Sequence, residues 1–188
     1  MATLLVHDKR LLGRTPSSIA DGAHEVGPNT LIQTMVSNVK GFTDTYGSAL
    51  DTLMIMCHGY ESTDTGRSSI PMSLGFGLQL CKESLTLANT GVMAGLSGYM
   101  NNIVLYACGP ANTAPFATGT YGDGRRFCSE LAAYTNANVF ASDETQYYNY
   151  GAKDNAIARV CEDSPIDFGG WEGHVYQFTP DGNVYMVQ

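Results

Sequence analysis

Two apolar segments decide the fold of this chain: Leu53-Met54-Ile55-Met56-Cys57-His58-Gly59 and Asn102-Ile103-Val104-Leu105-Tyr106-Ala107-Cys108-Gly109. Each is an apolar run of strand length that stops at a glycine, which is typical of a strand buried on both faces of a parallel sheet. Reactive groups collect at the carboxyl ends of the strands in such sheets. We therefore expect His58 and Cys108 to lie at one edge of the sheet, where an imidazole can serve a thiol as its base.

The rest of the chain alternates between strand-like and helix-like patterns. Strands are expected at 4–7, 52–57, 103–107 and 137–141, helices at 30–46, 89–100 and 125–134, and hairpins at 74–87 and 173–187. Polar segments at 8–29 and 61–69 should be loops. This order predicts an α/β fold, a three-layer sandwich with a mostly parallel central sheet and a C-terminal β-hairpin. The length of 188 residues predicts a single domain over 1–188.

The composition argues against several partners and locations. The net charge is -8 at pH 7, whereas a nucleic-acid-binding face needs clustered Lys and Arg. No segment approaches the roughly 20 apolar residues of a membrane span, and the N-terminus lacks the apolar core of a signal peptide. We therefore expect a cytoplasmic protein, or one delivered without a recognisable signal peptide, that contacts neither nucleic acid nor membrane. Its oligomeric state stays open.

The cysteines are expected to be reduced thiols. There are five of them, and their spacing matches no disulfide scaffold. Cys57 should point to the opposite side of its strand from His58 and belong to the core. A zinc site from Cys57, His58 and Cys108 would lack the paired spacing of zinc ligands. We expect neither a metal nor another cofactor.

Acyl transfer by Cys108 would need two further features beside a base. A free thiol is mostly protonated at neutral pH, so His58 would have to activate it or protonate the leaving amine. The developing oxyanion needs donors, and the backbone N–H groups of Gly59 and Cys108 lie where strands have just ended. Gly109 would let the chain turn sharply after the nucleophile.

These motifs, in this order, resemble the caspase-like superfamily of cysteine peptidases (clan CD). A strand ends in His58-Gly59, a second ends in Ala107-Cys108-Gly109, and the two reactive residues are 50 positions apart, close to the caspase spacing. Tyr106 and Pro110 stand where caspases have Gln and Gly, so the chain is not a caspase proper.

The resemblance implies both a site and a fold. His58 would be the acid/base, Cys108 the nucleophile, and the N–H groups of Gly59 and Cys108 the oxyanion hole, in a caspase-like sandwich. In this family the loop after the next strand helps to build the specificity pocket, and Ser142 and Asp143 stand there. Asp143 would then favour a basic P1 residue. The alternative is a solvated loop carboxylate or a helix N-cap.

The leading functional interpretation is a cysteine endopeptidase that acts on a protein or peptide substrate through a His58–Cys108 dyad. Its small size fits a bacterial-type peptidase or a delivered effector. Two alternatives stay open: a non-catalytic caspase-like module that binds a partner, and an amidase that uses the same dyad. His174 is expected to be structural or exposed, and the tyrosines at 147, 148 and 150 could form a substrate wall or a packed lid.

Overall fold

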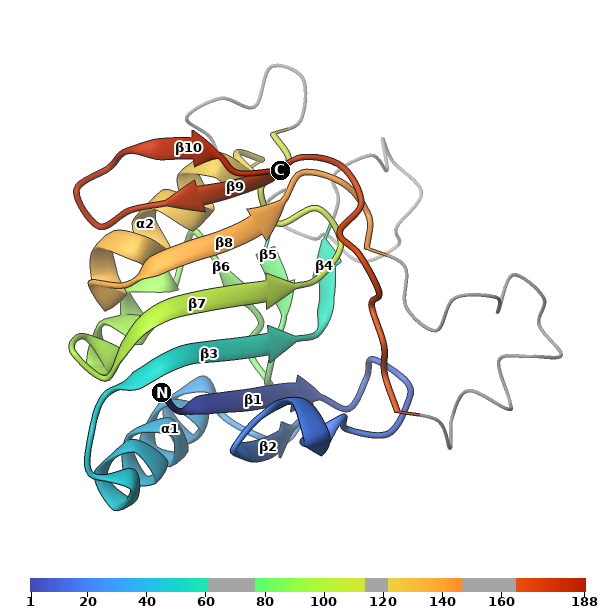
Figure 1. Cartoon of the computed structure of the whole chain (residues 1–188). Helices are drawn as coiled ribbons and strands as arrows, with labels where there is room; N and C mark the ends of the chain where they lie inside the picture. Colours follow the sequence, from blue (N-terminus) through green and yellow to red (C-terminus); the bar gives the residue numbers. More distant parts are fainter. Residues whose placement is uncertain (61–76, 114–121, 147–164) are drawn as a thin grey trace, which may run out of the picture.

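The computed structural model describes residues 1–60, 77–113, 122–146 and 165–188 (Figure 1). A seven-stranded sheet in the order β10-β9-β8-β7-β3-β1-β2 forms its centre. Five strands run parallel: β1 (Thr3–Asp8), β2 (Gly22–Val26), β3 (Leu50–Met56), β7 (Met100–Tyr106) and β8 (Asn138–Ser142). Two antiparallel strands extend it beyond β8: β9 (Val175–Phe178) and β10 (Val184–Met186). The prediction of an α/β fold with a mostly parallel sheet is confirmed.

A second, smaller sheet begins where β3 ends. It contains β4 (His58–Tyr60), β5 (Gly77–Gln79) and β6 (Leu85–Thr86), paired antiparallel in that order. Figure 1 shows the chain turning away from the main sheet between β3 and β4. The first residue after this turn is His58, so the turn sets the position of the imidazole relative to the central sheet.

The long helices cover one face of the main sheet, which we call the helix face (Figure 1). They are α1 (Ile32–Tyr46), the 3-10 helix η2 (Thr90–Leu96) and α2 (Gly124–Thr135). α1 ends at Gly47, whose φ of 81° needs a glycine. α2 begins at Asp123, whose carboxylate accepts a bond from the Arg126 N–H at 3.1 Å. Among the described residues, no helix is both long and apolar enough to cross a membrane.

The main core lies between the sheet and these helices. It is built from buried side chains of alternate strand positions packed against the apolar stripes of α1 and α2: Leu4, Val6, Leu53, Ile55, Ile103, Leu105, Val139, Ile32, Met35, Val36, Val39, Phe127 and Leu131. The alternation follows from the two-residue period of a strand. Cys57 and Ala107 belong to the same core.

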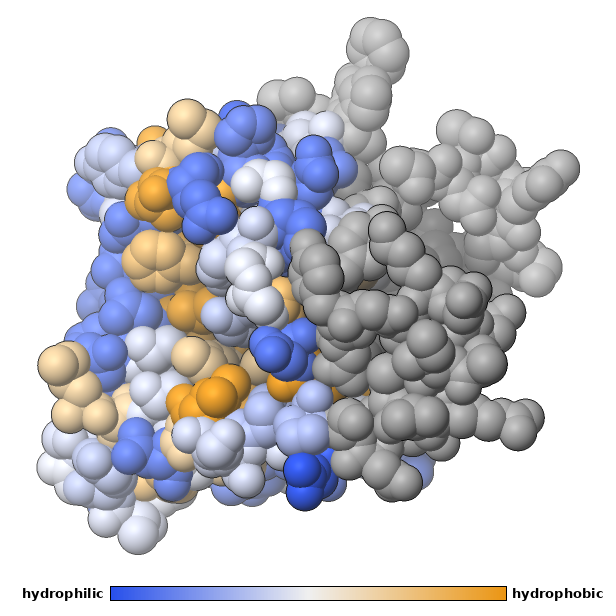
Figure 2. All heavy atoms as spheres, turned by 45° about the vertical axis from the view of Figure 1, so that its right-hand side comes forward, coloured by the Kyte–Doolittle hydropathy of each residue, from blue (hydrophilic) through white to orange (hydrophobic). Residues whose placement is uncertain are grey.

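The opposite face, which we call the open face, carries a smaller cluster of Leu5, Leu11, Met56, Ile166 and Phe168. Aromatic rings reinforce it, because Tyr106 stacks on Phe168 at 5.1 Å and on Trp171 at 4.7 Å between ring centroids. The short 3-10 helix η1 (Ser17–Ile19) lies near this cluster. In Figure 2 apolar side chains show among polar ones on the left of the molecule.

Three sequence predictions about elements need correction. The strands β3 and β7 are not buried on both faces: Met54 and Val104 are half-buried, because α1, η2 and α2 all pack on the other face. The helix predicted at 89–100 is only the 3-10 helix η2, in a segment weakened by glycines. The loop predicted at 8–29 contains β2, an edge strand whose sequence Gly-Ala-His-Glu-Val has little apolar alternation.

Candidate active site

β3 and β7 bring His58 and Cys108 to one edge of the sheet. The two strands are neighbours and parallel, with Met56 opposite Tyr106, and the Cys57 N–H donates to the Tyr106 carbonyl at 3.2 Å. His58 and Cys108 each follow this pair by two residues. The prediction that both follow strands at the same edge is therefore confirmed, and the strands are adjacent.

The chain segments that carry the two residues also pack directly on each other. Gly59 lies so close to the Cys108 peptide that an added Cβ would lie 2.7 Å from the Cys108 carbonyl carbon and 2.8 Å from its nitrogen, and would overlap its oxygen. Only glycine fits here. The absence of a side chain at Gly59 leaves space for the backbone of Cys108.

His58 is held by the loop after β1. Its Nε2 lies 3.1 Å from the backbone carbonyl oxygen of Arg10. A carbonyl can only accept, so Nε2 carries a proton and donates it. When the ring is neutral, Nδ1 is then the nitrogen that can take up a proton. This contact fixes both the tautomer and the direction of the ring.

The Arg10 carbonyl is itself held by a partly buried ion pair that the sequence analysis overlooked. Asp8 is fully buried and accepts from Arg10 Nε at 2.8 Å and Nη2 at 2.7 Å. The same carboxylate accepts from the Cys81 N–H at 2.8 Å, while Arg10 Nη2 donates to the Cys81 carbonyl at 2.6 Å. This ion pair, the Asp8–Arg10 clasp, joins the loop after β1 to the segment after β5. The sequence feature that could have revealed this ion pair is an acidic and a basic residue, Asp8 and Arg10, two positions apart at the end of the buried strand β1.

The loop after Cys108 turns as the sequence predicted. Gly109 adopts a φ of 52°, in the left-handed region that favours glycine, and its N–H donates to the Glu144 carbonyl at 2.9 Å. The Ala111 N–H donates to the Ser142 carbonyl at 2.9 Å. Cys108 therefore sits on a tight turn tied to the segment that follows β8.

Ser142 and Asp143 lie in that segment, but both are engaged inside the protein. Ser142 is buried, and its hydroxyl donates to the Glu172 carbonyl at 2.5 Å and accepts from the Glu144 N–H at 3.1 Å. The Asp143 carboxylate accepts from the His174 N–H at 2.9 Å and from the Tyr176 hydroxyl at 3.3 Å, and His174 Nδ1 lies 3.3 Å from it. These contacts hold the start of β9 and leave the Asp143 side chain 21% exposed.

The other described thiols are poorly suited to chemistry. Burial raises the pKa of Cys57 well above its ordinary value, raises that of Cys81 to about 12, and also raises that of Cys128. A raised pKa removes the reactive thiolate. Cys108 differs because it is half-buried, whereas these three are buried.

Other candidate groups are placed as follows. The described ranges contain no group of three or more His, Cys, Asp or Glu side chains that could hold a metal ion. His174 is 61% exposed at the start of β9. Cys161 and the tyrosines at 147, 148 and 150 lie outside the described residues.

Comparisons with known proteins do not identify a family for this chain. No protein-family model matches the chain, and no curated protein or solved structure is significantly similar to it.

Proposed function

We propose that this protein is a cysteine endopeptidase in which Cys108 is the nucleophile and His58 the acid/base. The observation that carries the proposal is the placement of both residues just beyond the register pair Met56 and Tyr106 on adjacent parallel strands, with Gly59 packed on the Cys108 peptide. Such a pair needs a base within reach of the thiol and a third group that orients the base. The Arg10 carbonyl is that third group.

The proposed reaction uses the His58 imidazole, the Cys108 thiol and two backbone N–H groups. His58 Nδ1 takes the thiol proton as Cys108 attacks the substrate carbonyl, and the imidazolium returns it to the leaving amine. The N–H groups of Gly59 and Cys108 belong to two adjacent backbone segments and would donate to the oxyanion. A water molecule then hydrolyses the acyl-enzyme, with His58 as its base, and the free thiol is restored.

The same proposal includes the fold and the substrate. We infer a caspase-like sandwich in which β9 and β10 form the C-terminal hairpin; of the three layers expected from the sequence, the described residues show the sheet and the helix layer of α1, η2 and α2. The adjacency of the two dyad strands and their order in the main sheet support it. The substrate is a protein or peptide, and a basic residue at P1 is favoured by a protein of net charge -8. Location in the cytoplasm, or delivery as an effector, stays part of the proposal.

Digestion of a peptide library tests this directly. Wild type should cut, and Cys108→Ala should not. Cys128→Ala removes a buried thiol of α2 that donates to the Pro110 carbonyl at 3.4 Å, and it should still cut if it folds. Iodoacetamide should label Cys108 much faster than the other four thiols. If wild type cuts nothing and Cys108 reacts no faster, the protein is a non-catalytic module. If it cuts only small amides, it is an amidase.

A further inference from the structure

His58, the proposed acid/base, is held from two sides, and both supports lead to the Asp8–Arg10 clasp. The first support acts on the ring, whose Nε2 lies 3.1 Å from the Arg10 carbonyl oxygen. The second acts on the backbone, because His58 opens β4 and is the register partner of Gln79 in β5. Two positions after Gln79 comes Cys81, whose N–H and carbonyl both bind the clasp. A single ion pair therefore connects the ring of His58 with the strand that carries it.

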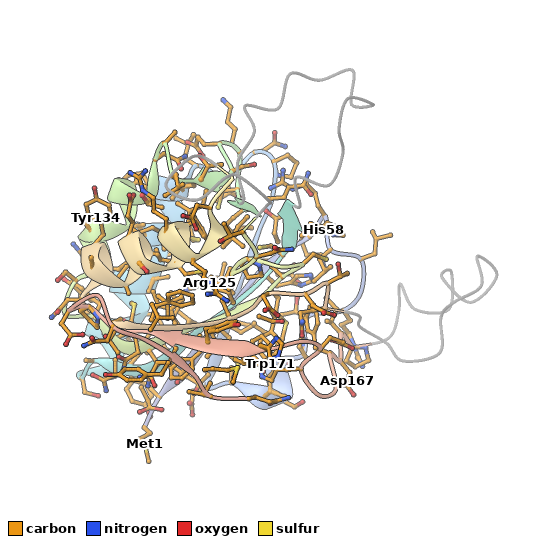
Figure 3. The ribbon with its side chains drawn as sticks, turned by 90° about the horizontal axis from the view of Figure 1, so that it is seen from above. Met1, His58, Arg125, Tyr134, Asp167 and Trp171 are labelled. Carbon is orange, nitrogen blue, oxygen red and sulfur yellow. The ribbon has the colours of Figure 1, made fainter. Side chains whose placement is uncertain are left out.

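The small sheet that carries His58 lies on the helix side of the main sheet. In Figure 3 His58 lies on the same side as α2, which Arg125 and Tyr134 mark, whereas Asp167 lies on the other side. Leu78 of β5 is fully buried in the main core. β4 itself has three residues, and a strand pair this short is marginal without further contacts. The position of His58 therefore depends on what ties this sheet to the end of β1.

Asp8 fixes the direction of the Arg10 carbonyl from two sides. Its carboxylate accepts from the Arg10 backbone N–H at 3.1 Å and from Nε and Nη2 of the same residue at 2.8 and 2.7 Å. The Leu11 N–H, which belongs to the same peptide unit as the Arg10 carbonyl, donates to the Asp8 carbonyl at 2.9 Å. The N–H and C=O of a trans peptide point in opposite directions. The Arg10 carbonyl is therefore directed away from Asp8 and toward His58.

Cys81 provides a second, independent sign that the clasp fixes this segment. Its φ of 59° lies in the left-handed region, which residues with a side chain disfavour. The Asp8 carboxylate accepts from its N–H at 2.8 Å, and Arg10 Nη2 donates to its carbonyl at 2.6 Å. A strained backbone persists where the surroundings enforce it, and such residues cluster at functional sites. The ion pair is the feature that satisfies both backbone groups of this strained residue.

We propose that Asp8 and Arg10 are positioning residues, which hold the His58 ring in its Nε2–H tautomer and leave Nδ1 as the nitrogen that takes the thiol proton. They act through the Arg10 carbonyl and touch neither substrate nor thiol. A neutral imidazole carries its proton on either nitrogen, and an acceptor fixed opposite Nε2 selects one of the two forms. The inference rests on the proposed peptidase function for its effect on rate, whereas the tautomer depends on the geometry alone.

Kinetics of matched variants test the effect on rate. Asp8→Asn keeps the size of the side chain but removes its charge, and Arg10→Lys keeps the charge but cannot donate two parallel bonds. Both leave the Arg10 carbonyl in place. Each should lower kcat by about 10- to 100-fold, the cost of a small displacement of a catalytic group, with KM nearly unchanged. The double variant should lose scarcely more than the worse single variant, because the two residues form one ion pair. Lys9→Gln, which removes the exposed Lys9–Glu25 ion pair from the same loop, is the control and should keep kcat.

The tautomer of His58 gives a readout that needs no activity. In the Cys108→Ala protein at about pH 8, where a free imidazole is neutral, NMR of the ring nitrogens should show the Nε2–H form alone. Adding Arg10→Lys should give a mixture of both tautomers, and adding Lys9→Gln should not. A purely structural role of the clasp would lower the melting temperature of Arg10→Lys without changing the tautomer.

The two measurements separate the clasp from the peptidase. Unchanged kcat in Arg10→Lys and Asp8→Asn overturns the positioning role and leaves the dyad standing. If Asp8→Asn does not fold, Arg10→Lys decides alone, since the Arg10 side chain is 24% exposed. If wild type cuts nothing, the peptidase is overturned, and a single tautomer that survives Arg10→Lys then overturns the clasp as well.

Discussion

The two faces of the main sheet differ in how completely they are covered. On the helix face, α1, η2 and α2 cover a continuous core of fully buried side chains. On the open face, a small cluster, an aromatic stack and two grooves lie over the same strands. In β3, Leu53 and Ile55 point to the helix face and are fully buried, whereas Met54 points the other way and is half-buried. One strand therefore contributes to stability with half of its side chains and to a surface with the other half.

The candidate site belongs to the carboxyl edge of the sheet, where the two faces meet. His58 and Cys108 follow the ends of β3 and β7, and the helix-face core, which includes Cys57 and Ala107, holds these strand ends in place. Substitutions at the site should therefore change activity, and substitutions on the helix face should change stability.

The largest effect on activity, beside loss of the nucleophile, is expected for His58→Ala. Removing the base should lower kcat/KM by about 100- to 10,000-fold, with little change in melting temperature, because the side chain is only half-buried. Combining it with Cys108→Ala should add little, since the two residues act on one step. The check is kcat/KM together with thermal unfolding. His24→Ala on the edge strand β2 is the control, and equal losses in both variants would contradict the assignment.

On the helix face we expect a substitution to lower stability rather than to act on the proposed site. Phe127→Ala in α2 removes a fully buried ring and should lower the free energy of unfolding by about 3–5 kcal/mol. Val104→Ala on the open face, at a half-buried position, should cost less than about 1 kcal/mol. Urea unfolding measures both. Similar losses at the two positions would show that the faces do not differ in the way described.

Gly59→Ala tests the contact between the segments that carry His58 and Cys108. An added methyl would overlap the Cys108 carbonyl oxygen, so the backbone must shift, at a cost of about 1–3 kcal/mol, and the shift moves His58 relative to Cys108. We expect a clear loss of kcat/KM. Gly91→Ala in η2 is the matched control, because its nearest neighbour would be the Tyr134 ring at 3.8 Å. Full activity in Gly59→Ala would show that the packing here is looser.

The contrast between the two faces also shows which parts of the fold could be predicted from the sequence. Apolar runs ending in glycine were enough to predict β3 and β7 and the shared edge of His58 and Cys108, because buried strands have a strong local pattern. They could not show that, within the described residues, α1, η2 and α2 all cover the same face, since that depends on where these helices pack. Asp8 and Arg10 are close in sequence, but their bonds to the Cys81 backbone join positions more than 70 residues apart, and a contact of such separation leaves no local signal.

The smallest effect is expected from His7, a buried titratable group on the open face. It is fully buried, and its Nε2 donates to the Leu11 carbonyl at 2.8 Å while Nδ1 lies 2.8 Å from the Thr15 hydroxyl. Burial lowers the pKa of His7 below 6.5, although the bond to Leu11 and the charges of Glu25 and Asp8 oppose this. Lys9 acts in the same direction as burial. The folded protein therefore binds this proton less readily than the unfolded chain.

The direction of the pH dependence follows from that difference. As the pH falls below 6.5, the unfolded chain takes up the proton first, so the free energy of unfolding should fall with the pH. His7→Gln keeps a donor for the Leu11 carbonyl but cannot titrate, and it should flatten this decline between pH 7 and pH 5. Urea unfolding across this pH range decides the matter, because parallel curves for wild type and His7→Gln would mean that the ring takes up its proton equally well in the folded and unfolded states.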